Sequence, residues 1–296
     1  MSHPISPDLI EQLVDLSRRA GDAIMAIYNH RDSYEIQHKT DESPLTAADL
    51  AANSLIAAGL PQLLELPIIS EEGEIPDFAD RGLWENFWLV DPLDGTKEFI
   101  AGNGEFTVNI ALVQHNRPIL GVVHVPATDI TYLGVLDARN PANLGAWKYV
   151  QGGNPKRIHV RSMSERYSNH QAFTVLLSHR HGTQATVDLM ETVKSRWVGP
   201  IETTNAGSSL KFCVIAEGNA DFYPRLAPTS EWDTAAAQAV LEAAGGKVVQ
   251  AEPGAGNNLI SLRYNAGEEL LNPHFYALGD KSFCWEWLLG LEELVS

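Results

Sequence analysis

The chain has 296 residues, which is long enough for one large domain or two smaller ones with a substantial core. It carries 38 acidic against 21 basic residues, and its net charge of −17 excludes binding to nucleic acid polymers or anionic membranes through a basic patch. Small phosphorylated substrates are not excluded, because bound cations can reverse the local field at a site.

The cysteine content and the first residues bear on the compartment. Two cysteines, Cys213 and Cys284, are too few for a disulfide framework. The opening MSHPISPDLI lacks the basic flank and apolar stretch of a signal peptide, and no run approaches the roughly 18 apolar residues that span a bilayer. We expect a cytoplasmic protein without an integral membrane segment, with peripheral attachment at the cytoplasmic face of the inner membrane as the alternative. The sequence leaves open whether it is a monomer or a homodimer.

The first half of the chain predicts two helices and then a series of strands. Apolar residues at helical spacing over 7–28 indicate an amphipathic helix, and a strand-like stretch follows at 34–39. A second helix is predicted to open at Pro44 to Thr46 and to end at Gly59. The apolar run at 66–70 predicts a short strand. Successive strand patterns with short connections then predict an antiparallel sheet, at 87–91, 105–114, 117–126, 129–136 and 146–150.

The second half alternates strands with helices. Strand patterns at 172–178, 220–225 and 247–250 are separated by helical patterns at 183–193, 208–218 and 231–246, which favours an α/β layer with a more parallel sheet. A tryptophan-rich tail at 282–294 predicts a closing helix. Because the segment 151–165 is polar and rich in turn residues, we expect a domain boundary there, with an N-terminal α+β domain of residues 1–160 and a C-terminal α/β domain of residues 161–296.

Acidic residues follow three apolar elements. Glu71 and Glu72 come after PIIS, Asp91 and Asp94 come after WLV, and Asp233 comes after Trp232. Ligands of α/β proteins bind in crevices at strand ends. The carboxylates at these ends therefore indicate a ligand or cation site, since they would repel one another without a cation.

The turn DPLDGT, residues 91–96, has features that suit a metal and a phosphate. Pro92 makes the turn rigid, so that Leu93 can offer its backbone carbonyl between two carboxylates. Gly95 permits close approach of the backbone, and Thr96 can open a helix whose N–H groups face an anion. Mg²⁺ prefers oxygen ligands and usually holds phosphate oxygens as well. Taken alone, however, an Asp-x-x-Asp-Gly turn is common and is more often an ordinary turn than a metal site.

Sequence motifs exclude several other kinds of binding or catalytic site and leave the role of one aspartate open. An EF-hand loop needs oxygen side chains where this turn has Leu93 and Gly95. The glycines at 102–104 form neither a dinucleotide fingerprint nor a phosphate loop, and no Gly-x-Ser-x-Gly elbow of a serine hydrolase occurs. Asp49 lies in the first turns of the second predicted helix, where a carboxylate complements the helix dipole, and local sequence supports no more than that role.

Three segments together resemble a known family. SEEG (70–73), WLVDPLDGTKEF (88–99) and EWDTAAAQAVLEAAGG (231–246) resemble, in this order and spacing, the signatures of the lithium-sensitive, magnesium-dependent phosphatases related to inositol monophosphatase. The stretches DPLDGTKEF, GSSLKFC and YPR further resemble those of the bacterial 3′(2′),5′-bisphosphate nucleotidases of this superfamily. The resemblance implies an α/β layered sandwich (α-β-α-β-α), with an antiparallel N-terminal sheet and an α/β C-terminal half.

The resemblance also implies an activity. Such an enzyme removes the 3′-phosphate of adenosine 3′,5′-bisphosphate (PAP) to give AMP and phosphate, in sulfur metabolism and nucleotide recycling, and the conversion of PAPS to APS is a further candidate reaction. The partner would be a small nucleotide bisphosphate. An inositol monophosphatase-like or other sugar phosphatase is the alternative within the same fold, and a non-catalytic nucleotide or metal sensor is the alternative from another class.

Carried over residue by residue, the resemblance implies two or three Mg²⁺ ions. The first would be held by Glu71, Asp91 and the carbonyl of Leu93. The second would be held by Asp91, Asp94 and Asp233, so that Asp91 bridges the two ions. Two such ions can stabilise both the attacking and the leaving oxygen of an in-line displacement.

The resemblance implies further roles at the nucleophile and the substrate. Thr96, oriented by Asp49, would position the attacking water, and Glu72 would help to align the nucleophile or a third ion. The set implied to bind substrate comprises Glu71, Leu93, Asp94, Gly95, Thr96, Lys211, Arg225 and Asp233. Within it, Gly95 and Thr96 would grip the scissile phosphate, whereas Lys211 and Arg225 are candidates for the other phosphate. Solvated positions for these two cations are equally compatible with the sequence.

Overall fold

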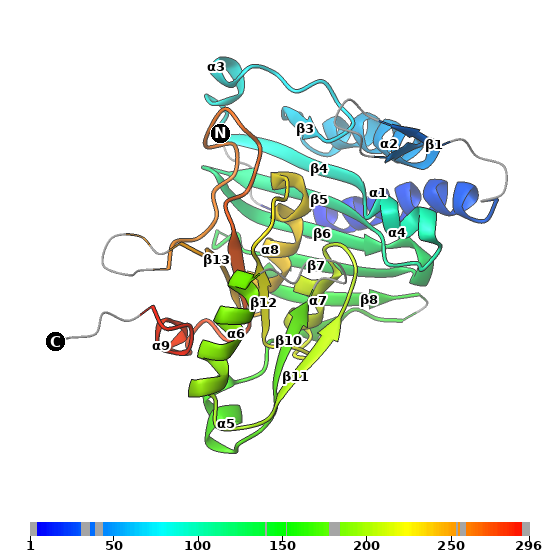
Figure 1. The fold of residues 1–296 in the computed structure, drawn as a ribbon. Helices are drawn as coiled ribbons and strands as arrows, with labels where there is room; N and C mark the ends of the chain where they lie inside the picture. Colours follow the sequence, from blue (N-terminus) through cyan, green and yellow to red (C-terminus); the bar gives the residue numbers. More distant parts are fainter. Residues whose placement is uncertain are drawn as a thin grey trace.

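The computed structural model describes residues 5–30, 36–38, 44–139, 141–151, 153–177, 184–252, 254 and 259–291. Their helices and strands form five layers (Figure 1): α1 and α2, a seven-stranded sheet, α7 and α8, a five-stranded sheet, and an outer layer with α5, α6 and α9. The predicted α-β-α-β-α sandwich is confirmed.

The first layer is built by two capped helices, α1 (Pro7–Tyr28) and α2 (Ala47–Leu63). At the start of α1, Ser6 accepts a hydrogen bond from the N–H of Leu9. The predicted end of the second helix at Gly59 is wrong, because the helix continues to Leu63. A Cβ atom at Gly59 would lie 2.6 Å from Leu16 Cδ1, so this glycine permits close packing of α2 on α1.

The large sheet has the strand order β3-β4-β5-β6-β7-β8-β9. Its strands are β3 (Ile68–Ser70), β4 (Asn86–Asp94), β5 (Thr107–Gln114), β6 (Arg117–Val125), β7 (Ile130–Val135), β8 (Gly145–Val150) and β9 (Lys156–Ile158). All neighbours pair antiparallel except β3 and β4, which are parallel. A separate pair, β1 (Ile36–His38) and β2 (Pro44–Thr46), precedes α2. The predicted antiparallel sheet is therefore present, with one parallel edge strand.

Side-chain alternation along β4 separates two cores. Phe87 and Leu89 face the layer between the sheets, whereas Trp88 and Val90 pack against α1 and α2. By this period of two, Asp91 follows Leu89 onto the inner face. The strand thus delivers its first aspartate between the two sheets.

The smaller sheet has the order β11-β10-β12-β14-β13. Its strands are β10 (Phe173–Leu177), β11 (Ile201–Asn205), β12 (Phe222–Arg225), β13 (Lys247–Gln250) and β14 (Phe275–Leu278). β10, β11 and β12 are parallel, whereas β14 is antiparallel to both β12 and β13. The sheet is mixed because β14, which the sequence patterns did not reveal, inserts between two predicted strands.

The remaining helices are α3 (Phe78–Arg81), α4 (Thr96–Ala101), α5 (Met163–Ser168), α6 (Gln184–Arg196), α7 (Leu210–Ala216), α8 (Ala235–Ala243) and α9 (Trp285–Leu288). Short 3₁₀ turns occur at η2 (Pro126–Thr128), η3 (Pro141–Asn143) and η4 (Glu231–Asp233). None of the helices in the described part of the chain combines the length and apolar character needed to cross a membrane.

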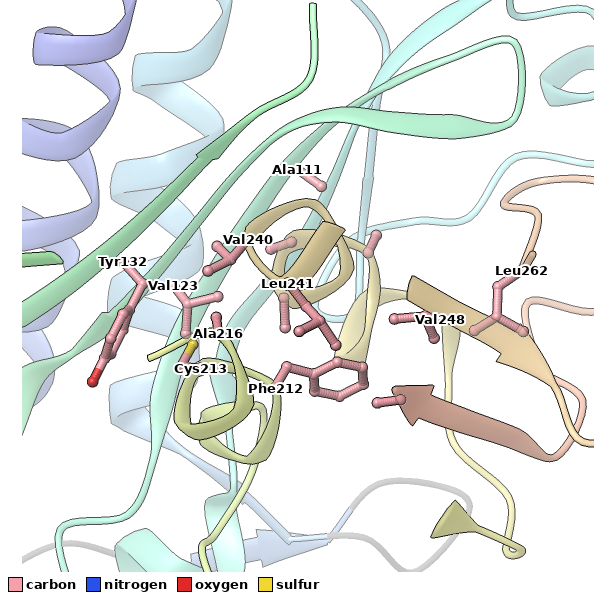
Figure 2. Close-up of a cluster of buried hydrophobic side chains, with 14 of the residues drawn as sticks. Ala111, Val123, Tyr132, Phe212, Cys213, Ala216, Val240, Leu241, Val248 and Leu262 are labelled. Atoms are coloured by element: carbon pink, nitrogen blue, oxygen red, sulfur yellow. The ribbon is translucent and has the colours of Figure 1, made fainter. Parts of the chain in front are cut away.

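The alanine-rich helix α8 lies very close to the large sheet. A Cβ atom at Gly121 would lie 2.2 Å from the carbonyl oxygen of Ala236, and one at Gly134 would lie 2.4 Å from that of Ala239. Small residues on both surfaces therefore permit this approach. Figure 2 shows the same layer, where α7 and α8 fill the space between the sheets with Phe212, Cys213, Ala216, Val240 and Leu241. The packing fixes the start of α8 beside the inner face of β4.

In the sequence, all strands of the large sheet come before residue 160 and all strands of the smaller sheet come after it, in agreement with the position of the predicted domain boundary. However, α8 from the second half packs against β6 and β7 of the first, and one hydrophobic cluster spans both halves. The division into two domains stays a prediction.

Candidate active site

An irregularity in β4 brings two aspartates to the same face. Asp91 pairs with Asn109 and Asp94 pairs with Thr107, so the register shifts between the two pairs. Leu93 packs into the outer cluster with α1 and α2. The bulge thus reverses the alternation, and Asp94 returns to the inner face like Asp91 although three positions separate them.

Asp233 joins them from the other half of the chain. It ends η4, just before α8, and its Oδ2 accepts a hydrogen bond of 2.9 Å from the N–H of Ser230. One carboxylate oxygen from each of Asp91, Asp94 and Asp233 lies within 4.8 Å of the others. The helix predicted to begin at 231 begins instead at Ala235, because this capped 3₁₀ turn precedes it.

The three carboxyl groups resist ionisation in this arrangement. Burial raises the pKa of Asp91 well above its usual value, and the charges of Glu71, Asp94 and Asp233 raise it further. Burial and the charge of Asp94 likewise raise the pKa of Asp233 well above normal. Burial also raises the pKa of Asp94, against the lowering effect of hydrogen bonds from Ser209. The cluster therefore favours either protons or a bound cation.

The glutamates follow strand β3. Parallel pairing lets the N–H of Glu71 donate to the carbonyl of Val90, 3.1 Å away, which places Glu71 next to Asp91. A side-chain hydrogen bond joins these two residues and also raises the pKa of Asp91. The carbonyl of Glu72 accepts from Asn53 Nδ2 at 3.2 Å, which ties this turn to α2. The structure thus brings Glu71 to the cluster and places Glu72 beside the helix that carries Asp49.

Asp49 has two distinct partners. Its Oδ2 accepts hydrogen bonds from the N–H (2.8 Å) and hydroxyl (2.6 Å) of Thr46 in the capping box of α2, whereas its Oδ1 accepts from the Thr96 hydroxyl at 3.3 Å. Burial raises the pKa of Asp49, and the hydrogen bonds from Thr46 oppose this. Asp49 therefore belongs to the capping box of α2 and also accepts a hydrogen bond from Thr96.

Gly95 occupies a position that other residues could not easily take. Its φ is +94°, in the left-handed region, and a Cβ atom there would lie 2.1 Å from Ser208 Oγ. The Thr96 hydroxyl, one residue on, is also 3.5 Å from the carbonyl oxygen of Leu93. The turn thus gathers Thr96 and the Leu93 carbonyl at the end of β4.

A cavity of about 210 Å³ adjoins the carboxylates, with Asp94, Gly95 and Asp233 in its wall. Lys211 and Arg225 line it as well. The Lys211 side chain is only 5% exposed; its Nζ donates to the carbonyl of Ser208 at 3.3 Å, and burial lowers its pKa. Arg225 Nη2 donates to the carbonyl of Pro228, and within the described residues its buried Nε has no hydrogen-bond partner.

Ser208, Ser209 and Asn109 touch the site although sequence reasoning assigned them no role. Ser208 Oγ lies 3.0 Å from the carbonyl oxygen of Asp94 and 2.9 Å from that of Glu105, and its single proton can go to either one. Ser209 and Asn109 both hydrogen-bond the carboxylate of Asp94. The serines belong to the GSSLKFC stretch that resembles the nucleotidases, which was the only sequence feature that pointed to them. No motif pointed to Asn109, because its contacts with the site join residues far apart in the sequence.

The donor set at the cluster consists of oxygen atoms alone. Glu71, Asp91, Asp94 and Asp233 offer carboxylates, and Leu93 offers a carbonyl at the same turn. Such a set suits a hard divalent cation like Mg²⁺ better than a soft metal that prefers thiolate or imidazole ligands. The raised pKa values of Asp91 and Asp233 also fit a site that gains charge compensation from a cation.

Comparisons with known proteins give a consistent result. The model of the inositol monophosphatase family matches residues 7–279. The curated "3′(2′),5′-bisphosphate nucleotidase CysQ" from Escherichia coli is 43% identical over 270 residues, covering 90% of this chain and 98% of that protein. The protein of the same name from Haemophilus influenzae is 32% identical over 284 residues, covering 95% and 96%.

Solved structures are similar along nearly the whole chain. The crystal structure of CysQ from Bacteroides thetaiotaomicron, described as a bacterial member of the inositol monophosphatase family, has a TM-score of 0.74 and 38% identity, covering 92% of this chain and 97% of that one. The extragenic suppressor protein suhB from Bartonella henselae has a TM-score of 0.69 at 19% identity, covering 97% and 100%, which shows a shared fold.

Proposed function

Because this chain belongs to the inositol monophosphatase family, we propose that it is a magnesium-dependent phosphatase that hydrolyses the 3′-phosphate of adenosine 3′,5′-bisphosphate (PAP) to AMP and phosphate. The observation that carries the proposal is the convergence of Asp91, Asp94 and Asp233 beside a cavity that also contains Lys211 and Arg225. Carboxylates that can hold a cation, together with two cationic side chains in the same cavity, suit a substrate with two phosphates. PAPS, with conversion to APS, is a further substrate within the same proposal.

The carboxylates would hold the metal. Glu71, Asp91 and the Leu93 carbonyl are the proposed ligands of a first Mg²⁺, and Asp91, Asp94 and Asp233 those of a second. Bound there, Mg²⁺ would stabilise the negative charge that develops on the attacking and leaving oxygens of phosphoryl transfer.

Thr96 and Asp49 would position the attacking water. Because the Thr96 hydroxyl donates its proton to Asp49 Oδ1, its oxygen lone pairs remain free to accept a hydrogen bond from water. Asp49 is held by Thr46 through its other oxygen, so its orientation is fixed. With Glu72 beside α2, a helper role for this residue toward the nucleophile is part of the proposal.

Lys211 and Arg225 would hold the phosphate that is not cleaved. Both line the cavity that Gly95 and Asp94 also line, so one bound substrate would be within reach of both pairs of residues. Charge-assisted hydrogen bonds contribute about 1.5–3 kcal/mol each. Gly95 and Thr96, which directly follow Asp94, would grip the scissile phosphate.

A comparison of substrates tests this proposal. The wild-type protein should turn over PAP with a higher kcat/KM than inositol 1-phosphate or fructose 1,6-bisphosphate. Lys211→Met should raise the KM for PAP roughly 10–100-fold, the equivalent of one charge-assisted hydrogen bond, and should leave any residual turnover of inositol 1-phosphate unchanged because that substrate has a single phosphate. A preference for inositol 1-phosphate would instead assign the chain an inositol monophosphatase activity. Binding of PAP without phosphate release would indicate a sensor.

A further inference from the structure

Ser209 lies where three elements of the site meet. Its side chain is 1% exposed, and it stands at the start of α7. Its N–H and its Oγ both lie 2.8 Å from Asp94 Oδ2, and its Oγ lies 2.6 Å from the carbonyl oxygen of Asp233. One residue therefore contacts a carboxylate from β4 and the backbone of η4.

The hydroxyl of Ser209 is not used to cap its helix. Serine at this position ordinarily accepts a hydrogen bond from an N–H group in the first turn. Here Ser209 is the N-cap of α7 with φ −67° and ψ −10°, and its side chain makes no capping hydrogen bond. Its side chain instead contacts Asp94, Asp233 and Asn109. This use of the hydroxyl points to a role in the site rather than in the helix.

The Ser209 hydroxyl has a single proton and two acceptors within reach. Asn109 Nδ2 donates to Ser209 Oγ at 2.9 Å, so one lone pair of that oxygen is occupied. The single hydroxyl proton then goes either to Asp94 Oδ2 or to the Asp233 carbonyl. Asp94 Oδ2 also accepts from the Ser209 N–H and, at 3.4 Å, from Asn109 Nδ2. These donors occupy one oxygen of Asp94 and leave Oδ1 as the oxygen available to a cation.

We propose that Ser209 is a positioning residue. It orients Asp94 so that Oδ1 is the oxygen that binds the metal, and it fixes the position of Asp94 relative to Asp233, the other proposed ligand of the same ion. The inference rests on the proposed function. Without the hydroxyl, the remaining donors are the Ser209 N–H and the longer contact from Asn109, and the repelling carboxylates nearby could turn Asp94 away. The ion held by Asp94 and Asp233 should therefore bind more weakly, whereas an ion held by Glu71 and Asp91 should change little.

The test is calorimetric titration of the metal-free protein with Mg²⁺ alone. Loss of a group that orients a metal ligand typically weakens metal affinity about 10–100-fold. Ser209→Ala should show this loss in one class of Mg²⁺ sites, and Ser209→Thr, which keeps a hydroxyl, should recover most of it. The control is Ser17→Ala, because Ser17 is fully buried and donates to the Val14 carbonyl within α1, away from the site.

A second readout separates positioning from general destabilisation. The Mg²⁺ concentration that half-activates PAP hydrolysis should rise in Ser209→Ala by the same factor as the dissociation constant, and saturating Mg²⁺ should restore most of kcat. If Ser209→Ala does not fold, Asn109→Leu takes its place, since it removes the amide that orients the Ser209 hydroxyl. Equal Mg²⁺ titrations for wild type and the variant that folds would overturn the inference, as would the same loss in Ser17→Ala. Absence of Mg²⁺ binding by wild type would instead refute the proposed function.

Discussion

The pair formed by Thr96 and Asp49 can be tested by a double-mutant cycle. In Asp49→Asn, the side-chain oxygen must stay on Thr46, because both the N–H and the hydroxyl of Thr46 donate to it. The amide nitrogen then faces Thr96 and cannot accept its proton. The Thr96 hydroxyl would have to donate to the Leu93 carbonyl instead, and the new amide would occupy one of its two lone pairs, so its oxygen would no longer face the attacking water in the same orientation.

The magnitude follows from the role proposed for this pair. Positioned proton acceptors typically contribute ~10²–10⁴ in rate, which corresponds to about 3–5 kcal/mol of transition-state stabilisation. Thr96→Ala and Asp49→Asn should each lower kcat in that range. The double variant should lose no more than the worse single variant, because the two residues act as a unit. Mg²⁺ affinity should barely change, since neither residue is a proposed metal ligand.

The assay is steady-state phosphate release from PAP at saturating Mg²⁺ for the wild type, both single variants and the double variant. Asp49→Asn also replaces the charged acceptor of the α2 capping box with a neutral one, which weakens its hydrogen bonds from Thr46. Ser6→Ala controls for this, because it removes the N-cap of α1 far from the site. A double variant whose loss equals the product of the two single losses would refute the proposed relay. Trapping of a phosphorylated enzyme during turnover would refute direct attack by water.

Three further predictions concern the metal site and the core. Asp91→Asn should abolish turnover but still fold. Its metal-free form should be at least as stable as wild type in thermal unfolding, because removing one carboxylate relieves repulsion from Asp94 and Asp233. Near-normal activity of this variant would contradict the two-metal assignment. Millimolar Li⁺ should inhibit PAP hydrolysis by replacing the ion held by Asp94 and Asp233, whereas full activity in Li⁺ would count against that site chemistry. His124 is 2% exposed, and burial lowers its pKa from 6.5 to about 4. Between pH 7 and 5 the imidazole is protonated in the unfolded chain but stays neutral in the folded protein. The free energy of unfolding, measured with urea, should therefore fall by about 2 kcal/mol more in wild type than in His124→Gln. The same pH dependence in both proteins would exclude a buried neutral imidazole.

Local sequence patterns predicted the elements that depend on neighbouring residues. The helix beginning at Pro7 and the strands from Asn86 to Val150 follow from apolar periodicity and turn residues. The family resemblance drawn from three motifs is confirmed by the match over residues 7–279. The convergence of Asp91 and Asp94 with Asp233 agrees with the ligand set implied by that resemblance, whose role in metal binding stays a prediction.

Features that depend on pairing between distant segments were not predicted. Gly59 was interpreted as a helix end, whereas its lack of a side chain serves the contact with Leu16 of another helix. Strand β14 has only four residues, and its partners β12 and β13 come from earlier in the chain.

The site contacts of Asn109 and Ser209 were missed for a related reason. The hydrogen bond from the Ser209 N–H to Asp94 joins positions 115 residues apart, and the pairing of Asn109 opposite Asp91 depends on the register of the sheet. Neither contact leaves a periodic or motif signal near the residues that make it, so only the folded arrangement reveals them.

We propose above that the acidic cluster holds the Mg²⁺ with which this chain hydrolyses PAP. The most direct measurement is phosphate and AMP release from PAP by the purified wild-type protein with Mg²⁺, after removal of metal by a chelator, and after Mg²⁺ is restored. We expect equal amounts of AMP and phosphate with Mg²⁺, no release of either product after chelation, and recovery of the activity when Mg²⁺ is restored. Hydrolysis that continues undiminished in excess chelator, or no release from PAP while another phosphate ester is hydrolysed, would contradict this proposal.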